Sequence, residues 1–326
     1  MIATKSLCPT CYKEITGLVS YNQDSVWMLK DCPEHGHFRA KIEDSIPWHL
    51  ICRKDYRNNI YNGYMIDVTD VCDLGCKYCY RPLNDAGHRP VKELVIEAKS
   101  YRTFVPFILS GGEPTMHPDM PVIIEELVKL GPVSLLTNGV RLCDKEYLDA
   151  LIKSGISTDG KYLNIVLSIH KESGGKDLEF LGLCRDNGLK VASAIFVIDD
   201  IEEIDGIVET YRAFKDALAS VRIRSAARIW NEDKPDGKIF VSSIINYLAG
   251  KGQIEIMADA LHNNKTSYGN VLFEKELTFY PSCWYDAANI DLNDIACPPY
   301  YKAKDGSVNN IVTSFLVNER IANANN

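Results

Sequence analysis

The sequence predicts an α/β fold: a partial (β/α)6 barrel, preceded by a small module of the zinc-ribbon or rubredoxin-like kind and followed by a C-terminal lid. Within residues 60–230, six segments with the apolar patterning of strands alternate with amphipathic helical segments. Two pairs of potential metal ligands flank a predicted β-hairpin in residues 1–55. The alternation ends near residue 230, so residues 231–326 form a separate extension that we expect to cover the barrel opening.

The composition restricts the class of protein. The 326 residues are 46% hydrophobic and 25% charged, which is typical of a globular protein with a sizeable core. The net charge of −8 argues against stable nucleic-acid binding, which usually needs a basic surface. Because no segment could span a membrane and the N-terminus lacks a signal-peptide pattern, we expect a cytoplasmic protein, not an integral membrane protein. Eleven cysteines then favour metal ligands over disulfides and predict oxygen sensitivity.

The first 55 residues contain two tight turns that each offer two metal ligands. The turns lie in SLCPTC and DCPEHGHF, on either side of the hairpin segments EITGLVSY and SVWMLK. Two such turns across a hairpin are typical of a zinc ribbon or a rubredoxin-like site, with four unrelated loop residues as the alternative. Zinc suits three cysteines and one histidine, and mononuclear iron is the second choice. The candidate ligands are Cys8, Cys11, Cys32 and His35, with His37 or Cys52 as alternatives for the fourth ligand.

The most informative stretch is the loop after the first predicted barrel strand, residues 64–69. Cys72, Cys76 and Cys79 follow that strand in a C-x3-C-x2-C spacing. Three thiolates on one loop can hold three irons of a [4Fe-4S] cluster and leave the fourth iron open. A zinc knuckle would need a fourth ligand and usually shows C-x2-C pairs, and three buried thiols are the remaining alternative. We therefore expect an iron–sulfur cluster with one open iron.

This loop, with the aromatic Tyr78 before its third cysteine, resembles the cluster loop of the radical S-adenosylmethionine (SAM) superfamily. The resemblance implies that the open iron binds the amino and carboxylate groups of SAM. It also implies that reductive cleavage of SAM yields a 5′-deoxyadenosyl radical. A low-potential electron donor, a flavodoxin or a ferredoxin, is the partner that such chemistry requires.

The N-terminal CPTC and CPEHG segments resemble one branch of this superfamily, which includes the archaeal tetraether lipid synthase and radical SAM pterin methyltransferases. The resemblance covers roughly the first 140 residues. The linker from Pro47 to Tyr64 lacks the additional cysteine cluster often found in those relatives. Their substrates therefore do not transfer directly to this chain.

The barrel elements follow in a regular order along the chain. Each strand pattern is followed by helical periodicity, which favours right-handed βα units and a parallel sheet. In such barrels the reactive residues lie at the carboxyl ends of the strands. The predicted strands are 64–69, 104–109, 133–139, 162–169, 190–198 and 220–225, and the helices between them are 91–101, 119–130, 144–154, 176–187 and 201–218.

Several of these strands end in residues that suit ligand binding. Paired glycines let the backbone approach a ligand closely, and a Gly-Gly-Glu segment in this place contacts the SAM amino group in the superfamily. A hydroxyl can hold a ribose, and a guanidinium can clamp a carboxylate or a phosphate. Plain turns and an ordinary salt bridge are the alternatives. The predicted SAM-binding residues are Tyr78, Gly111, Gly112, Glu113, Asn138, Ser168 and Arg224.

The C-terminal third shows a helical pattern at 238–249, two short strand patterns within 267–280, and an aromatic-rich stretch between Cys283 and Cys297. A radical site must exclude water, so this stretch is expected to form the lid. Cys283 is a candidate hydrogen-atom donor or substrate contact, with a packed thiol as the alternative. The catalytic candidates are Cys283, His170 and Tyr280.

Together these features predict a radical SAM enzyme that abstracts a hydrogen atom from a substrate that the sequence does not identify. The N-terminal resemblance suggests carbon–carbon bond formation or methylation. A radical-initiated redox reaction or rearrangement of a small metabolite or nucleotide is the alternative. A metal-binding adaptor with a degenerate barrel is a different class of function, and the intact cysteine triad and strand-end motifs argue against it.

Overall fold

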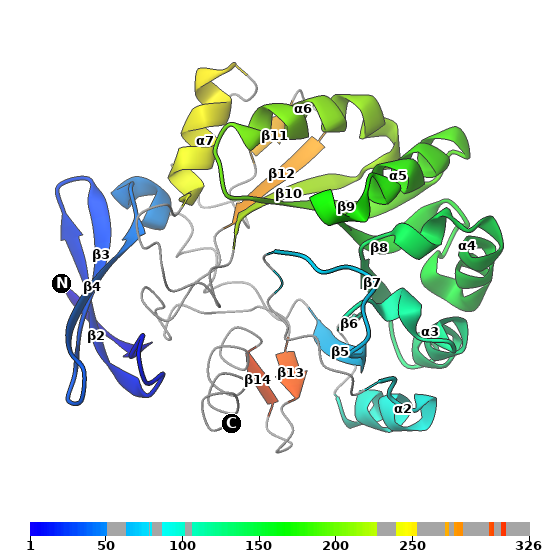
Figure 1. Cartoon of the computed structure of the whole chain (residues 1–326), viewed down its shortest axis with the longest axis horizontal. Helices are drawn as coiled ribbons and strands as arrows, with labels where there is room; N and C mark the ends of the chain where they lie inside the picture. Colours follow the sequence, from blue (N-terminus) through cyan, green and yellow to red (C-terminus); the bar gives the residue numbers. More distant parts are fainter. Residues whose placement is uncertain are drawn as a thin grey trace.

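The computed structural model describes residues 1–50, 63–77, 79, 87–101, 106–226 and 239–252, together with the backbone of four short strands between residues 271 and 310. Within this part of the chain the strands form two sheets. One is a four-stranded sheet at the N-terminus, and the other is a ten-stranded sheet that contains all the predicted barrel strands. Figure 1 shows the small blue sheet beside the larger unit.

The N-terminal sheet is an antiparallel meander. Its central hairpin has the predicted position, and Val26 and Met28 on its buried face pack with Val19 and Ile42 into a small core. So small a core cannot stabilise a sheet alone, which is the physical reason to expect a structural metal here. The strands are β1 (Ile2–Leu7), β2 (Glu14–Asn22), β3 (Ser25–Cys32) and β4 (Gly36–Glu43).

The six predicted barrel strands pair in parallel, each with its neighbour in sequence, which confirms the predicted α/β class. Four of them have the predicted bounds, because their β-branched, alternating sequences end in Gly, Asp or Ala-rich turns. The strands are β5 (Tyr64–Thr69), β6 (Phe107–Gly111), β7 (Val133–Thr137), β8 (Tyr162–Ile169), β9 (Lys190–Ile198) and β10 (Ser220–Ser225).

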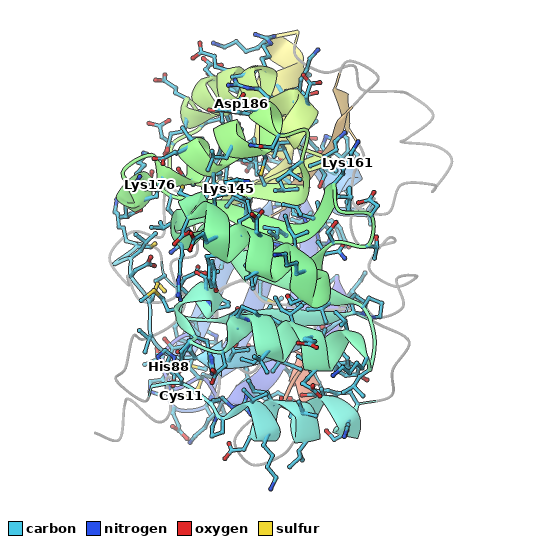
Figure 2. The ribbon with its side chains drawn as sticks, turned by 90° about the vertical axis from the view of Figure 1, so that its right-hand side faces the viewer. Cys11, His88, Lys145, Lys161, Lys176 and Asp186 are labelled. Atoms are coloured by element: carbon cyan, nitrogen blue, oxygen red, sulfur yellow. The ribbon has the colours of Figure 1, made fainter. Side chains whose placement is uncertain are left out.

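Helices cover one face of this sheet (Figure 1). Figure 2 views the molecule from the side of these helices, and Lys145 and Lys176 lie on their outer surface. The residues beneath these helices are fully buried, among them Leu109, Leu135 and Leu167 in three neighbouring strands. The opposite face of the sheet carries the strand-end residues of the candidate site. The helices are α2 (Val91–Ser100), α3 (Met120–Val128), α4 (Lys145–Leu151), α5 (Lys176–Asp186) and α6 (Glu203–Phe214).

The described C-terminal strands extend the sheet at both edges. Strand β12 (Leu277–Ser282) pairs in parallel with β10, and β13 (Tyr300–Lys302) pairs in parallel with β5. The outermost strands, β11 (Val271–Phe273) and β14 (Val308–Asn310), run antiparallel to them. An uncovered edge would leave unpaired backbone groups, so these strands complete the sheet beyond its six predicted members. Apart from these strands and residues 239–252, the predicted extension of residues 231–326 lies outside the described residues.

The N-terminal sheet contacts the larger unit at α7 (Val241–Gly250). The Glu43 carboxylate at the end of β4 accepts a short hydrogen bond from the Ser242 hydroxyl in the first turn of this helix. Trp48 packs against the main core, to which Ile244 and Leu248 of α7 belong. In the described part of the chain, no helix is long and apolar enough to cross a membrane.

Candidate functional site

The cluster loop begins where β5 ends, and the end of β6 lies against it. The backbone N–H groups of Gly112 and Glu113 donate to the carbonyls of Thr69 and Val71, each at 2.8 Å. A Cβ at Gly112 would lie 2.5 Å from the Val71 oxygen, and one at Gly111 would lie 2.2 Å from the Thr69 oxygen. Gly111 also has φ +143°, a conformation that side chains disfavour. The two glycines therefore bring the strand end into contact with the backbone that leads to the three cysteines.

The Glu113 carboxylate connects the ends of β6 and β7. Its Oε1 accepts hydrogen bonds from the N–H and the hydroxyl of Thr115 and from the hydroxyl of Thr137, and its Oε2 accepts from the N–H of Asn138. Glu113 is only 2% exposed, and burial raises its pKa even though these hydrogen bonds favour the ionised form. The chain itself thus supplies four donors to Glu113, and these hydrogen bonds join the ends of β6 and β7.

Asn138 links the end of β7 to the cluster loop. Its amide Nδ2 donates to the Asp73 carboxylate at 2.7 Å, and its Oδ1 accepts from the N–H of Val140 at 3.0 Å. Gly139 adopts φ +78°, so the chain turns sharply after Asn138. The chain thus turns at Asn138 and Gly139, and the amide of Asn138 points at the residue next to Cys72.

The other side of the loop is held by the ends of β8 and β9. The backbone N–H of Lys77 donates to Oε1 of Glu172 at 3.0 Å, and its Nζ lies 3.1 Å from Oδ2 of Asp199. Glu172 belongs to a short 3-10 helix, η4 (Lys171–Ser173), that follows β8. The hydrogen bond from Lys77 lowers the pKa of Glu172, so this carboxylate is ionised at neutral pH.

His170 and Glu172 lie beside one of the cluster cysteines. The ligand atoms of Cys76, His170 and Glu172 are all within 4.8 Å of one another. Burial lowers the pKa of His170, against the opposite effect of Glu172 and Asp177. The predicted candidate for substrate contact is therefore next to the loop, as a half-buried imidazole whose neutral form is favoured.

The three cysteines of the loop fit a cluster that supplies its own positive charge. Burial raises the pKa of Cys72 to about 11 and that of Cys76 to about 12, with further contributions from Glu113 and Glu172. Cys79 contributes to both shifts, so the three thiols are close enough to interact electrostatically. All three are free of disulfides and partly exposed. Three neighbouring sulfur donors on one loop suit three irons of a [4Fe-4S] cluster, whose charge would offset the cost of three thiolates.

The face of the sheet opposite the helices is polar near this loop. Ser168 of β8 is in register with Ile195 of β9, which is in register with Arg222 of β10. Paired residues of a parallel sheet share a face, and Arg224 lies two residues beyond Arg222 on the same face. Ser193, also on this face, is 1% exposed, and its hydroxyl has no partner within the described residues. Hydroxyl and guanidinium groups are thus among the residues on the face of the sheet opposite the helices.

Tyr280 belongs to β12, which lies beside β10. The backbone of Tyr280 is in register with Arg222. Tyr78, Cys52, Cys283 and Cys297 lie outside the described residues.

Sequence reasoning missed the polar residues that hold the loop. Asp73 and Lys77 lie between the cysteines and have no motif of their own. Glu172 and Asp199 could have been found, because each follows a predicted strand closely, as Asn138 does. Their role depends on contacts with residues about 100 positions away in sequence, and no local pattern reveals such contacts.

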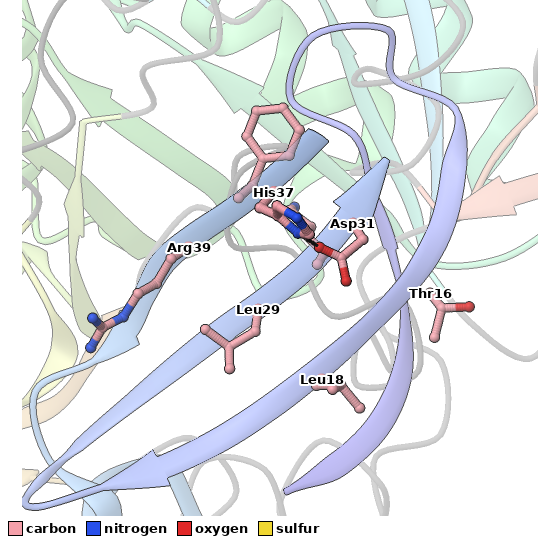
Figure 3. Close-up of a pocket in the computed structure, with 8 residues that line it drawn as sticks. Thr16, Leu18, Leu29, Asp31, His37 and Arg39 are labelled. Atoms are coloured by element: carbon pink, nitrogen blue, oxygen red, sulfur yellow. Dashed lines mark hydrogen bonds and ion pairs between the residues drawn. The ribbon is translucent and has the colours of Figure 1, made fainter. Parts of the chain in front are cut away.

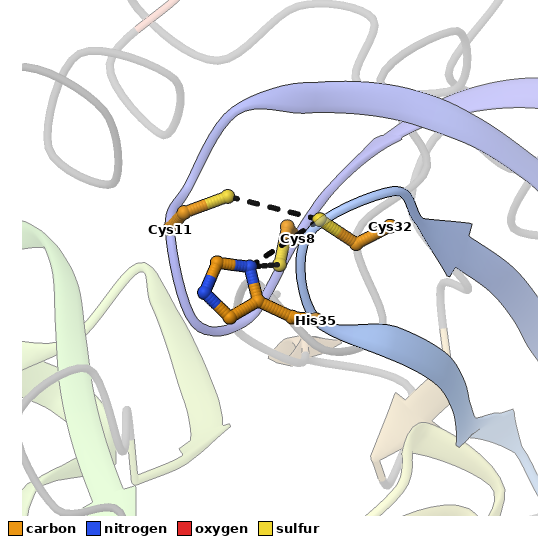
Figure 4. Close-up of side chains that lie close together, drawn as sticks. All are labelled: Cys8, Cys11, Cys32 and His35. Carbon is orange, nitrogen blue, oxygen red and sulfur yellow. Dashed lines mark hydrogen bonds between the residues drawn. The ribbon is translucent and has the colours of Figure 1, made fainter.

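The predicted ligands of the N-terminal module form a second site (Figure 4). Cys8 and Cys11 lie in the turn between β1 and β2, Cys32 is the last residue of β3, and His35 lies in the turn between β3 and β4. The Nδ1 of His35 is 3.8 Å from the sulfur of Cys8 and 3.4 Å from that of Cys32, and the sulfurs of Cys11 and Cys32 are 3.9 Å apart. Ligands at about 2.3 Å from a tetrahedral zinc ion lie about 3.8 Å from each other. The donor set therefore fits zinc.

His37, the alternative fourth ligand, lies elsewhere. It pairs with Asp31 on the outer face of the sheet, where both side chains are exposed. Figure 3 shows this pair beside a shallow hollow that Thr16, Leu18, Leu29 and Arg39 also line. The hollow belongs to the outer face of the module, so the barrel's strand ends do not contribute to it.

Two family models match the chain. The model of the radical SAM superfamily matches residues 66–213, which run from β5 into α6. The model of the HMPTM N-terminal zinc ribbon domain matches residues 2–44, which contain β1 to β4. These matches confirm the predicted radical SAM barrel and the predicted zinc-ribbon module.

The curated relatives are enzymes of this superfamily. The 7,8-dihydro-6-hydroxymethylpterin dimethyltransferase of Methanocaldococcus jannaschii is 28% identical over 191 residues, which cover 48% of this chain and 37% of that protein. The GTP 3′,8-cyclase of Aquifex aeolicus is 25% identical over 240 residues, which cover 66% of this chain and 65% of that protein. This chain thus matches less than two thirds of the length of either relative.

Solved structures of SuiB from Streptococcus suis share the fold. The structure bound to the precursor peptide SuiA has a TM-score of 0.52 and 13% identity, with 83% of this chain and 64% of that chain covered. A further SuiB structure has a TM-score of 0.53 and 13% identity, with 83% and 65% covered. Likeness at this identity concerns the fold alone.

Proposed function

Because this chain belongs to the radical SAM superfamily, we propose that it is an enzyme that begins a radical reaction on a small heterocyclic substrate and ends it by carbon–carbon bond formation or methylation. One observation carries the choice of outcome. The zinc ribbon and the radical SAM domain follow each other in this chain, and the ribbon model is that of the HMPTM family. The pterin dimethyltransferase of M. jannaschii is accordingly the relative whose reaction we take as the first guide.

Cys72, Cys76 and Cys79 are the proposed ligands of a [4Fe-4S] cluster with one open iron. The proposed contacts of SAM lie on the strand ends beside that loop. When bound, SAM at such a cluster supplies, on one-electron reduction, a 5′-deoxyadenosyl radical that abstracts a hydrogen atom from the substrate. The SAM contacts that we propose are Tyr78, Gly111, Gly112, Asn138, Ser168 and Arg224, with Glu113 fixing the strand ends.

The chain's own residues would position the reactants and limit access of water. Backbone carbonyls of the glycine segment suit an ammonium group, because the Glu113 carboxylate already accepts four hydrogen bonds. Arg224 suits a carboxylate or a phosphate, and Ser168 suits a ribose hydroxyl. The candidates for substrate contact remain His170, Tyr280 and Cys283, and residues 231–326 are the proposed lid over the barrel.

The remaining parts follow from the same proposal. Residues 1–55 would form a structural zinc module with Cys8, Cys11, Cys32 and His35 as ligands, since four protein ligands leave no open position for chemistry. Residues 60–230 would form the catalytic barrel. A flavodoxin or a ferredoxin would supply the electron, and a reducing, cytoplasmic environment suits the free cysteines of the described residues.

A second candidate is supported by the match to the GTP 3′,8-cyclase of A. aeolicus, which covers more of this chain than the match to the pterin dimethyltransferase. It is a radical-initiated redox reaction or rearrangement of a small metabolite or nucleotide. The two candidates differ in their SAM products. A methylating enzyme that takes its methyl group from SAM yields S-adenosylhomocysteine besides 5′-deoxyadenosine, whereas a rearrangement yields 5′-deoxyadenosine without S-adenosylhomocysteine.

The test is anaerobic reconstitution with iron and sulfide, followed by addition of SAM and dithionite with either a reduced hydroxymethylpterin or GTP. We expect about four irons in the barrel and formation of 5′-deoxyadenosine. Cys76→Ala should lose both, while Cys143→Ala, at a half-buried thiol outside the loop, should keep both. A wild-type chain that binds no cluster would refute the proposal and leave a metal-binding adaptor.

A further inference from the structure

One acidic group beside the cluster loop has no assigned role. Glu172 follows β8, and its Oε1 accepts the backbone N–H of Lys77 at 3.0 Å. Its ligand oxygen is within 4.8 Å of the Cys76 sulfur. The carboxylate therefore lies at the one cysteine that stands between the other two in sequence.

The nearest lysines pair with other acids. The Nζ of Lys77 lies 3.1 Å from Oδ2 of Asp199, and the Nζ of Lys171 lies 2.8 Å from Oε2 of Glu203. Among the described residues no ion pair within 4 Å includes Glu172, so the charges of Lys171 and His170 act on it only from a greater distance. The hydrogen bond that holds Glu172 comes from a neutral amide, which fixes the carboxylate in place and leaves its negative charge acting on Cys76.

A fixed negative charge next to a cluster ligand makes addition of an electron to the cluster less favourable. Net charge and hydrogen bonds around the ligands are the main protein contributions to the reduction potential of an iron–sulfur cluster. Glu172 is exposed and Cys76 is partly buried, so water screens their interaction in part, but less than it screens two fully hydrated charges.

Building on the function proposed above, we propose that Glu172 is a positioning residue that fixes the Cys76 side of the cluster loop and lowers the reduction potential of the cluster. The redox step concerned is the gain of one electron by the cluster. Dithionite, or a low-potential electron-transfer protein, is the reductant. A lower reduction potential makes the reduced cluster a stronger one-electron donor, and it makes the oxidised cluster harder to reduce.

Glu172→Gln separates the two parts of this role. The glutamine keeps the size of the side chain and an oxygen that can accept from Lys77, and it removes only the charge. Glu172→Ala removes the acceptor as well. Glu126→Gln is the matched control, since it removes one negative charge from an exposed ion pair on α3.

The readout is the midpoint potential of the reconstituted cluster, measured by redox titration with electron paramagnetic resonance, together with iron content. We expect Glu172→Gln to hold about four irons, as the wild type does, and to shift the midpoint to a higher potential. Glu126→Gln should leave the midpoint unchanged, and Glu172→Ala should retain less iron.

The outcomes separate the two proposals. A Glu172→Gln chain with full iron content and an unchanged midpoint would refute the role of the charge, while the proposed function would stand. Full iron retention in Glu172→Ala would refute the positioning role. A wild-type chain with no reducible cluster would refute the proposed function and this inference together.

Discussion

The side-chain amide of Asn138 donates a 2.7 Å hydrogen bond to the carboxylate of Asp73, across 65 positions of sequence. Asp73 follows the first cluster cysteine, and Lys77, which follows the second, is held by Glu172 and Asp199 in the same way. The ends of β7, β8 and β9 thus fix the loop that leaves β5. The sheet acts as a rigid frame for the three sulfurs, which is what a precise cluster site requires.

Asn138→Asp should disturb the cluster loop more than Asn138→Ala. The aspartate would place a second carboxylate against Asp73, whereas alanine only removes a hydrogen bond, which to a charged group contributes about 1.5–3 kcal/mol. We expect reduced iron retention after reconstitution and desalting, in the order Asn138→Asp, Asn138→Ala, wild type. Asn187→Ala, which removes an exposed amide at the end of α5, is the control. If both Asn138 variants retained as much iron as the wild type, that result would contradict the importance of this contact.

Two glycine-to-alanine substitutions should have opposite effects on stability. A Cβ at Gly111 would lie 2.2 Å from the Thr69 oxygen, and its φ of +143° disfavours alanine, so Gly111→Ala should destabilise by about 2 kcal/mol or more. Gly182 lies within α5 with nothing within 4 Å of its Cβ position. Gly182→Ala should therefore be neutral or stabilise by about 0.5–1 kcal/mol.

Urea unfolding of the two glycine variants beside the wild type, at matched metal content, measures both changes. Equal midpoints for Gly111→Ala and the wild type would mean that β6 can move away from the cluster loop without cost. That result would weaken the assignment of the glycine segment as a close-contact site.

The regular part of the fold could be predicted from the sequence, because local patterns determine it. Strands β5, β8, β9 and β10 have the predicted bounds, and β6 begins directly after Pro106, which cannot donate in a ladder. The edge strands β13 and β14 were missed, since each has only three residues and its pairing partner is distant in sequence. Their formation depends on an open sheet edge, which no local pattern describes.

The candidate site could be predicted where metal ligands or glycines occur at a characteristic spacing along the sequence. The cysteine loop and the ribbon ligands are recognised by such spacings. Glu113, predicted as an acceptor for an ammonium group, also accepts four internal hydrogen bonds, three of them at Oε1 and one at Oε2. A single sequence cannot show such contacts, which arise only when Thr137 and Asn138 fold against Glu113.

His35→Ala and His37→Ala should separate the metal ligand from its neighbour. His35 lies with the three ribbon cysteines, whereas His37 forms an exposed pair with Asp31. We expect His35→Ala to bind zinc more weakly by at least tenfold in chelator competition, and to unfold the ribbon at a lower temperature. His37→Ala should bind zinc as the wild type does, since an exposed ion pair contributes about 0–1 kcal/mol. If His37→Ala bound zinc more weakly than His35→Ala, His37 would be the fourth ligand instead of His35.

Glu43 should make the contact between the ribbon and α7 sensitive to pH. The carboxylate is 6% exposed, and burial raises its pKa above the ordinary value of 4.5 despite hydrogen bonds from Ser242 and Asp44. Because the folded-state pKa is higher than the unfolded one, the unfolded chain loses its proton first as pH rises. The stability that protonated Glu43 provides is therefore present below about pH 4.5 and is lost as pH rises through the folded-state pKa.

Glu43→Gln cannot ionise, so its melting temperature should rise relative to that of the wild type in a series of pH values that increases from 4.5. Both proteins are compared in the zinc-loaded form, so that metal release does not enter. Glu34→Gln is the control, because Glu34 is exposed and Lys13 lowers its pKa, so its variant should not gain on the wild type with rising pH. Parallel curves of melting temperature against pH for the wild type and Glu43→Gln would mean that Glu43 stays ionised throughout this range. In that case the Ser242 hydroxyl and the first turn of α7 would stabilise its charge sufficiently to keep the ribbon bound to the helix.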